Sequence, residues 1–199
     1  MSETSKAHER RIRDGFYEYL QKNKFGYYKE DPKILDIGYA GTGGQTFPGF
    51  DVVGLDKNTP GYDGIRLPYE DESFDIVYSS HLLEHLPDSE ILYREHIREQ
   101  FRILCHGGFL IAYVPHMELY EKKTELPSQF NLEHRRFYTP ARLLQIFEEV
   151  LNYNHDHEYV MNQYRVRRCQ DCDEGFDYSL PPEIHSVGEY SIEVVLEKL

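Results

Sequence analysis

The stretch Ile34-Leu35-Asp36-Ile37-Gly38-Tyr39-Ala40-Gly41-Thr42-Gly43-Gly44 decides the fold, together with Val52-Val53-Gly54-Leu55-Asp56, which follows it. In each segment an apolar run of strand length ends in residues suited to a ligand, first a glycine-rich turn and then a carboxylate. Glycine lets the backbone approach a ligand closely, and an acid that closes the next strand can accept hydrogen bonds from both ribose hydroxyls. The pair therefore predicts a site for a cofactor that carries a nucleoside. A glycine run that only forms a turn is the alternative.

The composition is that of a globular chain of 199 residues, 40% hydrophobic and 29% charged, a length that suits one domain with its own core. No apolar run approaches the roughly 20 residues of a membrane span, and the first residues lack the apolar segment of a signal peptide. With only three cysteines as well, we expect a cytoplasmic protein. The formal net charge of −13 repels phosphate backbones, which disfavours a nucleic-acid substrate.

The hydrophobic pattern predicts alternating strands and helices. Strands are expected at residues 33–37, 51–55, near 62–66, at 74–79, 109–114, about 158–166 and 190–196, and helices at about 7–24, 87–104 and 140–150. In the last helix Thr139 is the expected N-cap and Pro140 the first residue. Gly107-Gly108 is expected to stop the helix before it. This alternation predicts an α/β sheet that is parallel at first and ends in an antiparallel hairpin.

Four blocks of sequence, in this order and spacing, are similar to those of a known family. They are the glycine loop 36–44, then Asp56, then the segment 67–77 running into Leu83-Glu84-His85-Leu86, and last the segment 101–111 around Gly107-Gly108. On these blocks the chain resembles the class I S-adenosylmethionine-dependent methyltransferases from about residue 33 to 199.

The resemblance implies a single methyltransferase domain over residues 1–199, with an N-terminal helical segment at 1–30. The implied fold is a Rossmann-like, mostly parallel sheet of about seven strands with helices on both faces. The implied cofactor is S-adenosylmethionine, and the implied reaction is methyl transfer to a small-molecule or glycan acceptor.

Two features depart from the usual pattern of this family. Ala40 interrupts the glycine spacing, and only residues 45–50 separate the loop from the second strand. Parallel strands normally need a dozen or more connecting residues, so we expect the first crossover helix to be shortened or absent. This compact form resembles a subgroup common in bacterial glycan and lipopolysaccharide biosynthesis, which points to a saccharide hydroxyl as the acceptor.

The resemblance also implies which residues bind the cofactor. Asp56 would accept the ribose hydroxyls, although a turn cap is the alternative role for this residue. Asp63, four residues before Leu67-Pro68, would lie near the adenine amine, and the backbone of Ile65 would meet the ring. The full set of cofactor-binding candidates is Asp36, Gly38, Tyr39, Ala40, Gly41, Gly43, Asp56, Lys57, Asp63, Gly64, Ile65, Ser79 and His81.

A sugar hydroxyl is a poor nucleophile and would benefit from a general base. His116, directly after the predicted strand 109–114 and Pro115, is the first candidate, and His134 is the second, because histidine titrates near neutrality. A structural histidine is the alternative for each. The irregular segment 115–140 is expected to form a lid on the acceptor side, since long irregular loops in compact domains are often functional. Its candidate contact residues are Tyr120, Phe130, Arg135, Arg136 and Tyr138, for which an aromatic patch closing the core is the alternative.

Other functions stay open at this point. The altered glycine loop suits a binding module without catalysis. A nicotinamide-dependent oxidoreductase would need a glycine-x-glycine-x-x-glycine turn that opens a helix, and no helix fits before Asp51. The stretch His81-Leu82-Leu83-Glu84-His85 has the inverted zinc-protease pattern, and Cys169-Gln170-Asp171-Cys172 has metal-pair spacing, with His155 and His157 nearby in sequence. Because a third zinc ligand and a second cysteine pair are not evident, no metal site is assigned.

Overall fold

A computed structural model describes residues 3–23, 31–39, 47, 50–153, 158–159, 161–185 and 187–199. The helices are α1 (Glu3–Arg13), α2 (Phe16–Asn23), α3 (Glu90–Arg102) and α4 (Pro140–Leu151), with a 3-10 helix η1 (Leu83–His85) and a π-helical turn η2 (Met117–Glu121). The strands are β1 (Ile34–Ile37), β2 (Val52–Leu55), β3 (Phe74–Ser80), β4 (Leu104–Pro115), β5 (Tyr164–Cys172) and β6 (Ser191–Lys198).

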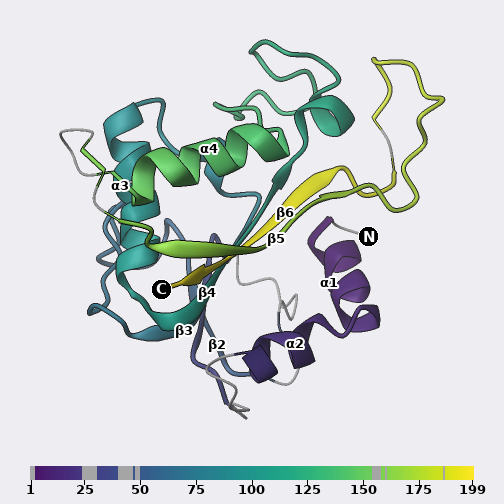
Figure 1. Cartoon of the computed structure of the whole chain (residues 1–199). Helices are drawn as coiled ribbons and strands as arrows, with labels where there is room; N and C mark the ends of the chain where they lie inside the picture. Colours follow the sequence, from purple (N-terminus) through teal and green to yellow (C-terminus); the bar gives the residue numbers. More distant parts are fainter. Residues whose placement is uncertain are drawn as a thin grey trace.

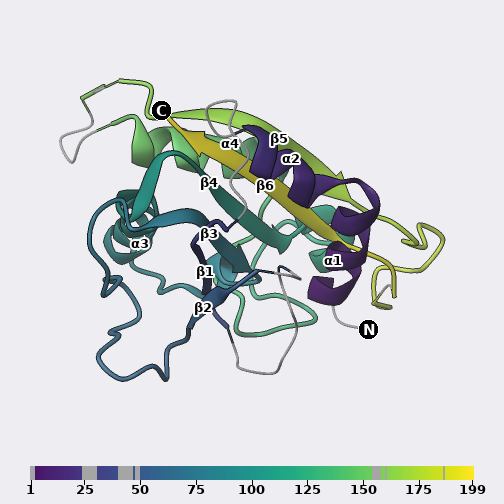
Figure 2. The ribbon, with the colours of Figure 1, turned by 90° about the horizontal axis from the view of Figure 1, so that it is seen from below.

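The sheet has the order β2-β1-β3-β4-β6-β5. The first four of these strands pair in parallel, whereas β6 pairs antiparallel with both β4 and β5. Figure 1 shows α3 and α4 on one side of this sheet and α1 and α2 on the other, and Figure 2 shows the same arrangement from below. The α/β fold with an antiparallel C-terminal hairpin is therefore confirmed.

The sheet of the described residues has six strands, so the expected count of about seven was wrong. The strand expected near residues 62–66 is a turn instead. The Asp63 carboxylate accepts hydrogen bonds from the backbone nitrogens of Ile65 (2.8 Å) and Arg66 (2.7 Å), which satisfies donors that a strand would have used. Most of the connection from β1 to β2 lies outside the described residues, so the shortened crossover helix stays a prediction.

Three element boundaries differ from the sequence-based expectation. The N-terminal helix is broken between α1 and α2, where Gly15 takes a left-handed φ of 63°. The pair Gly107-Gly108 lies inside β4 and does not stop α3, which already ends at Arg102. A Cβ at Gly108 would lie 2.8 Å from the carbonyl oxygen of Asp75, so only glycine lets β4 pass β3 this closely. β5 begins at Tyr164, later than expected, and continues to Cys172.

Alternating side chains of the buried strands form two apolar layers, as period-two geometry requires. Leu35 and Val77 belong to the layer that includes α3 and α4, whereas Ile34 and Tyr78 belong to the layer that includes Phe16 of α2. The expected cap of α4 is confirmed, because the Thr139 hydroxyl accepts a hydrogen bond from the backbone nitrogen of Arg142 at 3.2 Å. None of the described helices is both long and apolar enough to cross a membrane.

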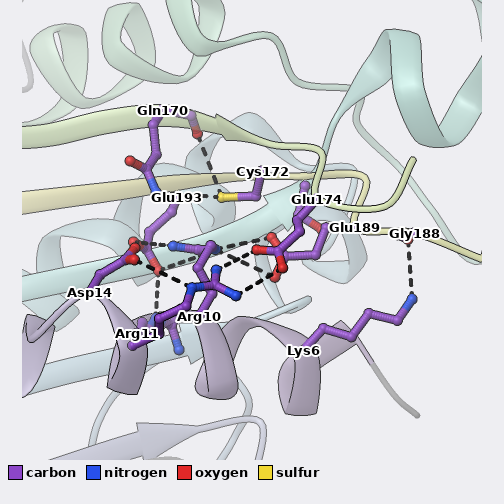
Figure 3. Close-up of polar contacts among 12 residues, drawn as sticks. Lys6, Arg10, Arg11, Asp14, Gln170, Cys172, Glu174, Gly188, Glu189 and Glu193 are labelled. Carbon is purple, nitrogen blue, oxygen red and sulfur yellow. Dashed lines mark hydrogen bonds and ion pairs between the residues drawn. The ribbon is translucent and has the colours of Figure 1, made fainter. Parts of the chain in front are cut away.

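A buried ion pair joins α1 to β6 (Figure 3). The Nε of Arg11 lies 2.5 Å from an oxygen of Glu193, and both side chains are 0% exposed. Arg10 adds a second guanidinium to Glu193 at 3.4 Å and also pairs with Glu189 at 3.0 Å. Burial alone would raise the pKa of Glu193, but the two guanidinium groups outweigh it and lower that pKa to about 2.

We expect Glu193→Gln to lower the free energy of unfolding by about 3–5 kcal/mol, because it leaves the fully buried Arg11 without its anion. Urea denaturation measures this loss. A matched control is Glu174→Gln, which breaks the exposed pair with Arg13 and should change stability little.

The low pKa of Glu193 also defines a pH range over which the protein should lose stability. Because it lies near 2 in the folded state and near 4.5 ordinarily, the wild type should lose on the order of 3 kcal/mol as pH falls through that interval. A Glu193→Gln variant with wild-type stability and wild-type acid sensitivity would contradict this assignment.

Candidate functional site

A cavity of about 640 Å³ lies at the carboxyl ends of β1, β2 and β3. β1 is paired with β2 on one side and β3 on the other, so the chain reverses its direction of travel across the sheet at β1. Open parallel sheets bind ligands at such a point, and this volume is in the usual range for small-molecule sites. Seven of the predicted cofactor-binding residues line the cavity: Gly38, Asp56, Lys57, Asp63, Gly64, Ile65 and His81.

The glycine loop begins at this cavity. Gly38 has a left-handed φ of 87°, and its N–H donates to the carbonyl of Leu55 at 2.7 Å. Tyr39 does not line the cavity but covers β2, since a Cβ at Gly54 would come within 2.3 Å of its ring. The structure therefore fixes the start of the loop against the end of β2.

Five other predicted cofactor-binding residues are not among those that line the cavity. Asp36 and Ser79 are buried within β1 and β3. Ala40, Gly41 and Gly43 lie outside the described residues, so their roles stay predictions.

Asp56 lies at the cavity and also stabilises a turn, so the ribose contact stays a prediction. It follows the last residue of β2 and lines the cavity. Its Oδ1 also accepts hydrogen bonds from the backbone nitrogen (3.0 Å) and side-chain amide (2.6 Å) of Asn58. The backbone nitrogen of Asp56 donates to the Thr59 hydroxyl at 3.0 Å. These bonds hold the carboxylate in one orientation at the edge of the cavity.

Both backbone polar groups of Ile65 already have partners within the chain. Its N–H donates to Asp63, and its carbonyl lies 3.2 Å from His96 Nδ1, which must be the donor. The hydrogen bonding therefore gives no support to a contact between this backbone and an adenine ring. The same bonds from Ile65 and Arg66 lower the pKa of Asp63.

His96 is a buried support for this wall of the cavity, and the sequence analysis did not single it out. Its Nδ1 bonds to Ile65, whereas its Nε2 is buried and has no hydrogen-bond partner in the described part of the chain. Burial lowers the pKa of His96 to about 4, because protonation would place a charge in an apolar setting.

His81 stands at the rim of the cavity, directly after β3. It has a left-handed φ of 51°, an uncommon conformation for a residue other than glycine, and one that clusters at functional sites. Its backbone nitrogen donates to the carbonyl of Tyr113 at 2.7 Å. Its Nδ1 lies 3.3 Å from a carboxylate oxygen of the fully buried Glu84. Sequence reasoning missed this partnership, although the His-x-x-Glu spacing was visible within the zinc-protease pattern.

The two predicted general bases occupy different positions. His116 is buried away from the cavity lining, where its Nδ1 accepts from the backbone of Glu118 at 3.0 Å and its Nε2 lies 3.3 Å from Asp171. His134 is also buried, but its ring lies 4.9 Å from the ring of His85, and His85 lines the cavity. His134 is therefore one side chain removed from the cavity.

The expected lid segment 115–140 is divided between core and site. Tyr138 is fully buried and its hydroxyl lies 3.1 Å from that of Tyr93, while Arg136 stacks on the Tyr93 ring at 3.9 Å. These two residues close the core. Glu133 and Arg135 line the cavity, so this part of the segment can contact a ligand.

Neither of the two metal-ligand patterns considered from the sequence has the geometry expected for it. η1 covers only Leu83–His85, so His81 lies on the strand end and does not share a helix face with His85. Cys169 and Cys172 are three residues apart in β5, which directs them to opposite faces of the sheet. They accordingly pack in different core clusters. His155 and His157 lie outside the described residues.

The comparisons with known proteins agree with this geometry. The sequence profile of the family described as "Methyltransferase domain" matches residues 50–112, which include Asp56, His81 and most of β4. No curated protein sequence is similar enough to the chain to count as a match.

Solved structures show the same fold at low sequence identity. The YcgJ protein from Bacillus subtilis matches with a TM-score of 0.57 at 13% identity, over 94% of this chain and 97% of that one. A methyltransferase from Methanosarcina mazei gives a TM-score of 0.56 at 16% identity, over 88% and 96% of the two chains. A methyltransferase from Aquifex aeolicus gives a TM-score of 0.55 at 15% identity, over 94% of this chain and 89% of that one.

The chain therefore has the Rossmann-like fold of class I methyltransferases, and its residues 50–112 match the methyltransferase family. Methyltransferases with this fold use S-adenosylmethionine, which is the cofactor that the family match implies. The comparisons leave the acceptor undetermined and give no support for the glycan and lipopolysaccharide subgroup.

We expect His96→Gln to flatten the pH dependence of the protein's stability. In the wild type the unfolded chain binds a proton near pH 6.5 and the folded chain only near 4. Stability should therefore fall by about 3 kcal/mol as pH drops through this window. Glutamine keeps a donor for Ile65 but cannot titrate, so urea unfolding at a series of pH values should show a smaller loss. An unchanged slope between pH 6.5 and 4 would exclude His96 as its source.

Proposed function

We propose that the cavity at the ends of β1, β2 and β3 binds S-adenosylmethionine and presents its methyl group to a hydroxyl of a small-molecule or saccharide acceptor. The single observation that carries this proposal is that Asp56 and His81 line one cavity, although they come from different strands. Asp56 would accept the ribose hydroxyls, and Gly38 would let the backbone approach the cofactor.

His81 is the best placed of the histidines to act as general base. Methyl transfer from a sulfonium to an oxygen is an in-line displacement, so the C–O bond forms as the C–S bond breaks and the sulfur becomes a neutral thioether. The hydroxyl proton then needs an acceptor. His81 lines the cavity, and its Nδ1 lies 3.3 Å from a carboxylate oxygen of Glu84, while its Nε2 lies 3.4 Å from the Ser191 hydroxyl. The Glu84 charge would stabilise the imidazolium that forms when the ring takes the proton. His134 is the next candidate, and His116 follows, since only the ring of His134 contacts a lining residue.

The side of the cavity expected to face the acceptor is charged. Glu133 and Arg135 line it, and the His81 ring packs against the rings of Tyr113 and Tyr190. The Tyr120 ring contacts Tyr190 as well. Hydroxyl-rich acceptors suit such a surface, because charged side chains can form hydrogen bonds with their hydroxyls.

We expect Asp56→Ala to weaken S-adenosylmethionine binding by about 10- to 100-fold, the effect of losing charge-assisted hydrogen bonds to the ribose. Isothermal titration calorimetry measures this change. The matched control is Asp51→Ala, an exposed carboxylate just before β2, at the opposite end of the strand from Asp56. Equal loss in the two variants, or none in Asp56→Ala, would refute this placement of the ribose.

We expect His81→Gln to lower kcat by about 100-fold or more while the affinity for S-adenosylmethionine changes little, because the base acts on the acceptor. The measurement is S-adenosylhomocysteine formation with a panel of monosaccharides, oligosaccharides and phenols. The exposed His106→Gln serves as control. Cofactor binding without turnover of any acceptor would favour a binding module over an enzyme.

A further inference from the structure

Beside the cavity, three side chains bring potential metal-ligand atoms together. These are Glu84 and His85 of η1 and His134 of the segment that follows η2, and their ligand atoms all lie within 4.8 Å of one another. Glu84 and His134 are buried, while His85 is half-buried and lines the cavity. The group therefore stands between the protein interior and the ligand site.

The Glu84 carboxylate is the unusual member of this group. It is 0% exposed, and neither of its oxygens has a hydrogen-bond partner in the described structure. The basic side chains near it are imidazoles, with His81 Nδ1 at 3.3 Å and His85 Nε2 at 4.0 Å. A buried carboxylate without hydrogen bonds is costly, which is a reason for it to be paired or to coordinate a cation.

His134 is oriented as metal-binding histidines usually are. Its Nδ1 lies 2.6 Å from an oxygen of Glu121, and the other oxygen of Glu121 accepts a hydrogen bond from Ser128 at 2.5 Å. This carboxylate fixes the ring and its tautomer, with the proton on Nδ1 and the lone pair on Nε2. Carboxylate–histidine pairs of this kind orient the ligands of zinc sites.

A backbone hydrogen bond connects η1, which carries Glu84 and His85, to the segment that carries His134. The N–H of Arg135, next to His134, donates to the carbonyl of Glu84 at 2.7 Å. The ring of Tyr120 covers His134 at 5.2 Å. Neighbouring side chains and backbone thus keep the three ligands in place.

We propose that Glu84, His85 and His134 bind one divalent zinc ion. Two imidazole nitrogens and one carboxylate oxygen form a ligand set found in zinc enzymes, where the fourth position stays open for water or substrate. Zinc bonds of about 2.1 Å require ligand atoms about 3.4 Å apart, so small side-chain rotations suffice. Because His85 lines the cavity, the open position would face the ligand site. The set differs from the sequence pattern by using His134 in place of His81.

The catalytic use of this ion rests on the proposed function. A zinc ion at this rim would bind the acceptor oxygen and lower the pKa of its hydroxyl, as zinc does for bound water. His81 would receive the released proton, and the alkoxide would attack the methyl group of the sulfonium. The products are the methylated oxygen, the neutral thioether and the protonated base.

The test is zinc binding itself, measured without any acceptor. The full chain is stripped with a chelator, titrated with zinc by calorimetry, and its metal content is determined after gel filtration. We expect one zinc per chain, and an affinity at least about 10-fold lower in each of Glu84→Gln, His85→Ala and His134→Gln. Two control variants should bind zinc like the wild type: His106→Ala, and Cys105→Ser combined with Cys169→Ser.

Circular dichroism and S-adenosylmethionine titration of the same proteins separate this proposal from the proposed function. His134 lies behind His85 and outside the cavity lining, so His134→Gln should still bind the cofactor while it loses zinc. The wild type binding no stoichiometric zinc would overturn the site, as would full zinc affinity in folded His85→Ala. Loss of zinc only in the cysteine variant would assign the metal to the thiols and also overturn it. Cofactor binding with no zinc binding would leave the proposed function standing without this ion.

Discussion

Parallel pairing of β2, β1, β3 and β4 is the constraint on which the site depends. Because these strands run the same way in register, their carboxyl ends meet at one edge of the sheet. Gly38, Asp56 and His81 follow three different strands and are far apart in sequence, yet they line one cavity. Strand direction alone brings them together, and the turns after each strand then orient the side chains. Two examples are the hydrogen bonds from Asn58 that orient Asp56 and the left-handed backbone conformation of His81.

The opposite face of the sheet is organised by charge as well as by apolar packing. Arg11 is fully buried and is held by Glu193 and by the Tyr78 hydroxyl, on β6 and β3 respectively. A buried ion pair contributes little net stability compared with an apolar replacement, but it accepts only one arrangement of its partners. We infer that this pair sets the position of α1 along β6. The edge of the sheet that carries the cavity and the helices that cover its face thus depend on different forces.

The sequence analysis predicted structural features that depend on residues close together in the chain. It missed side-chain contacts between residues that are far apart in the chain. β1, the glycine turn and Asp56 lie within one short segment, so this part of the site could be recognised from the sequence. The start of α4 could also be recognised, because Thr139-Pro140 is a typical helix start. A short strand was expected at residues 62–66, but the Asp63 side chain accepts hydrogen bonds from the backbone nitrogens of Ile65 and Arg66 and forms a turn there. His116 was expected at the site because it follows a central strand. It faces Asp171, a residue of β5 that is far away in sequence, and no local pattern reveals such a partner.

The position of β6 has a consequence for how this protein is made. β6 lies between β4 and β5, although it follows both in sequence, and β5 pairs with no other strand in the described sheet. While the ribosome is still synthesising residues 116–190, one edge of β4 therefore has no strand to pair with, and β5 has no place in the sheet. The sheet can close only after residues 191–198 have left the ribosome. Until then the unpaired edges of its strands are open to other chains, which exposes the incomplete protein to aggregation.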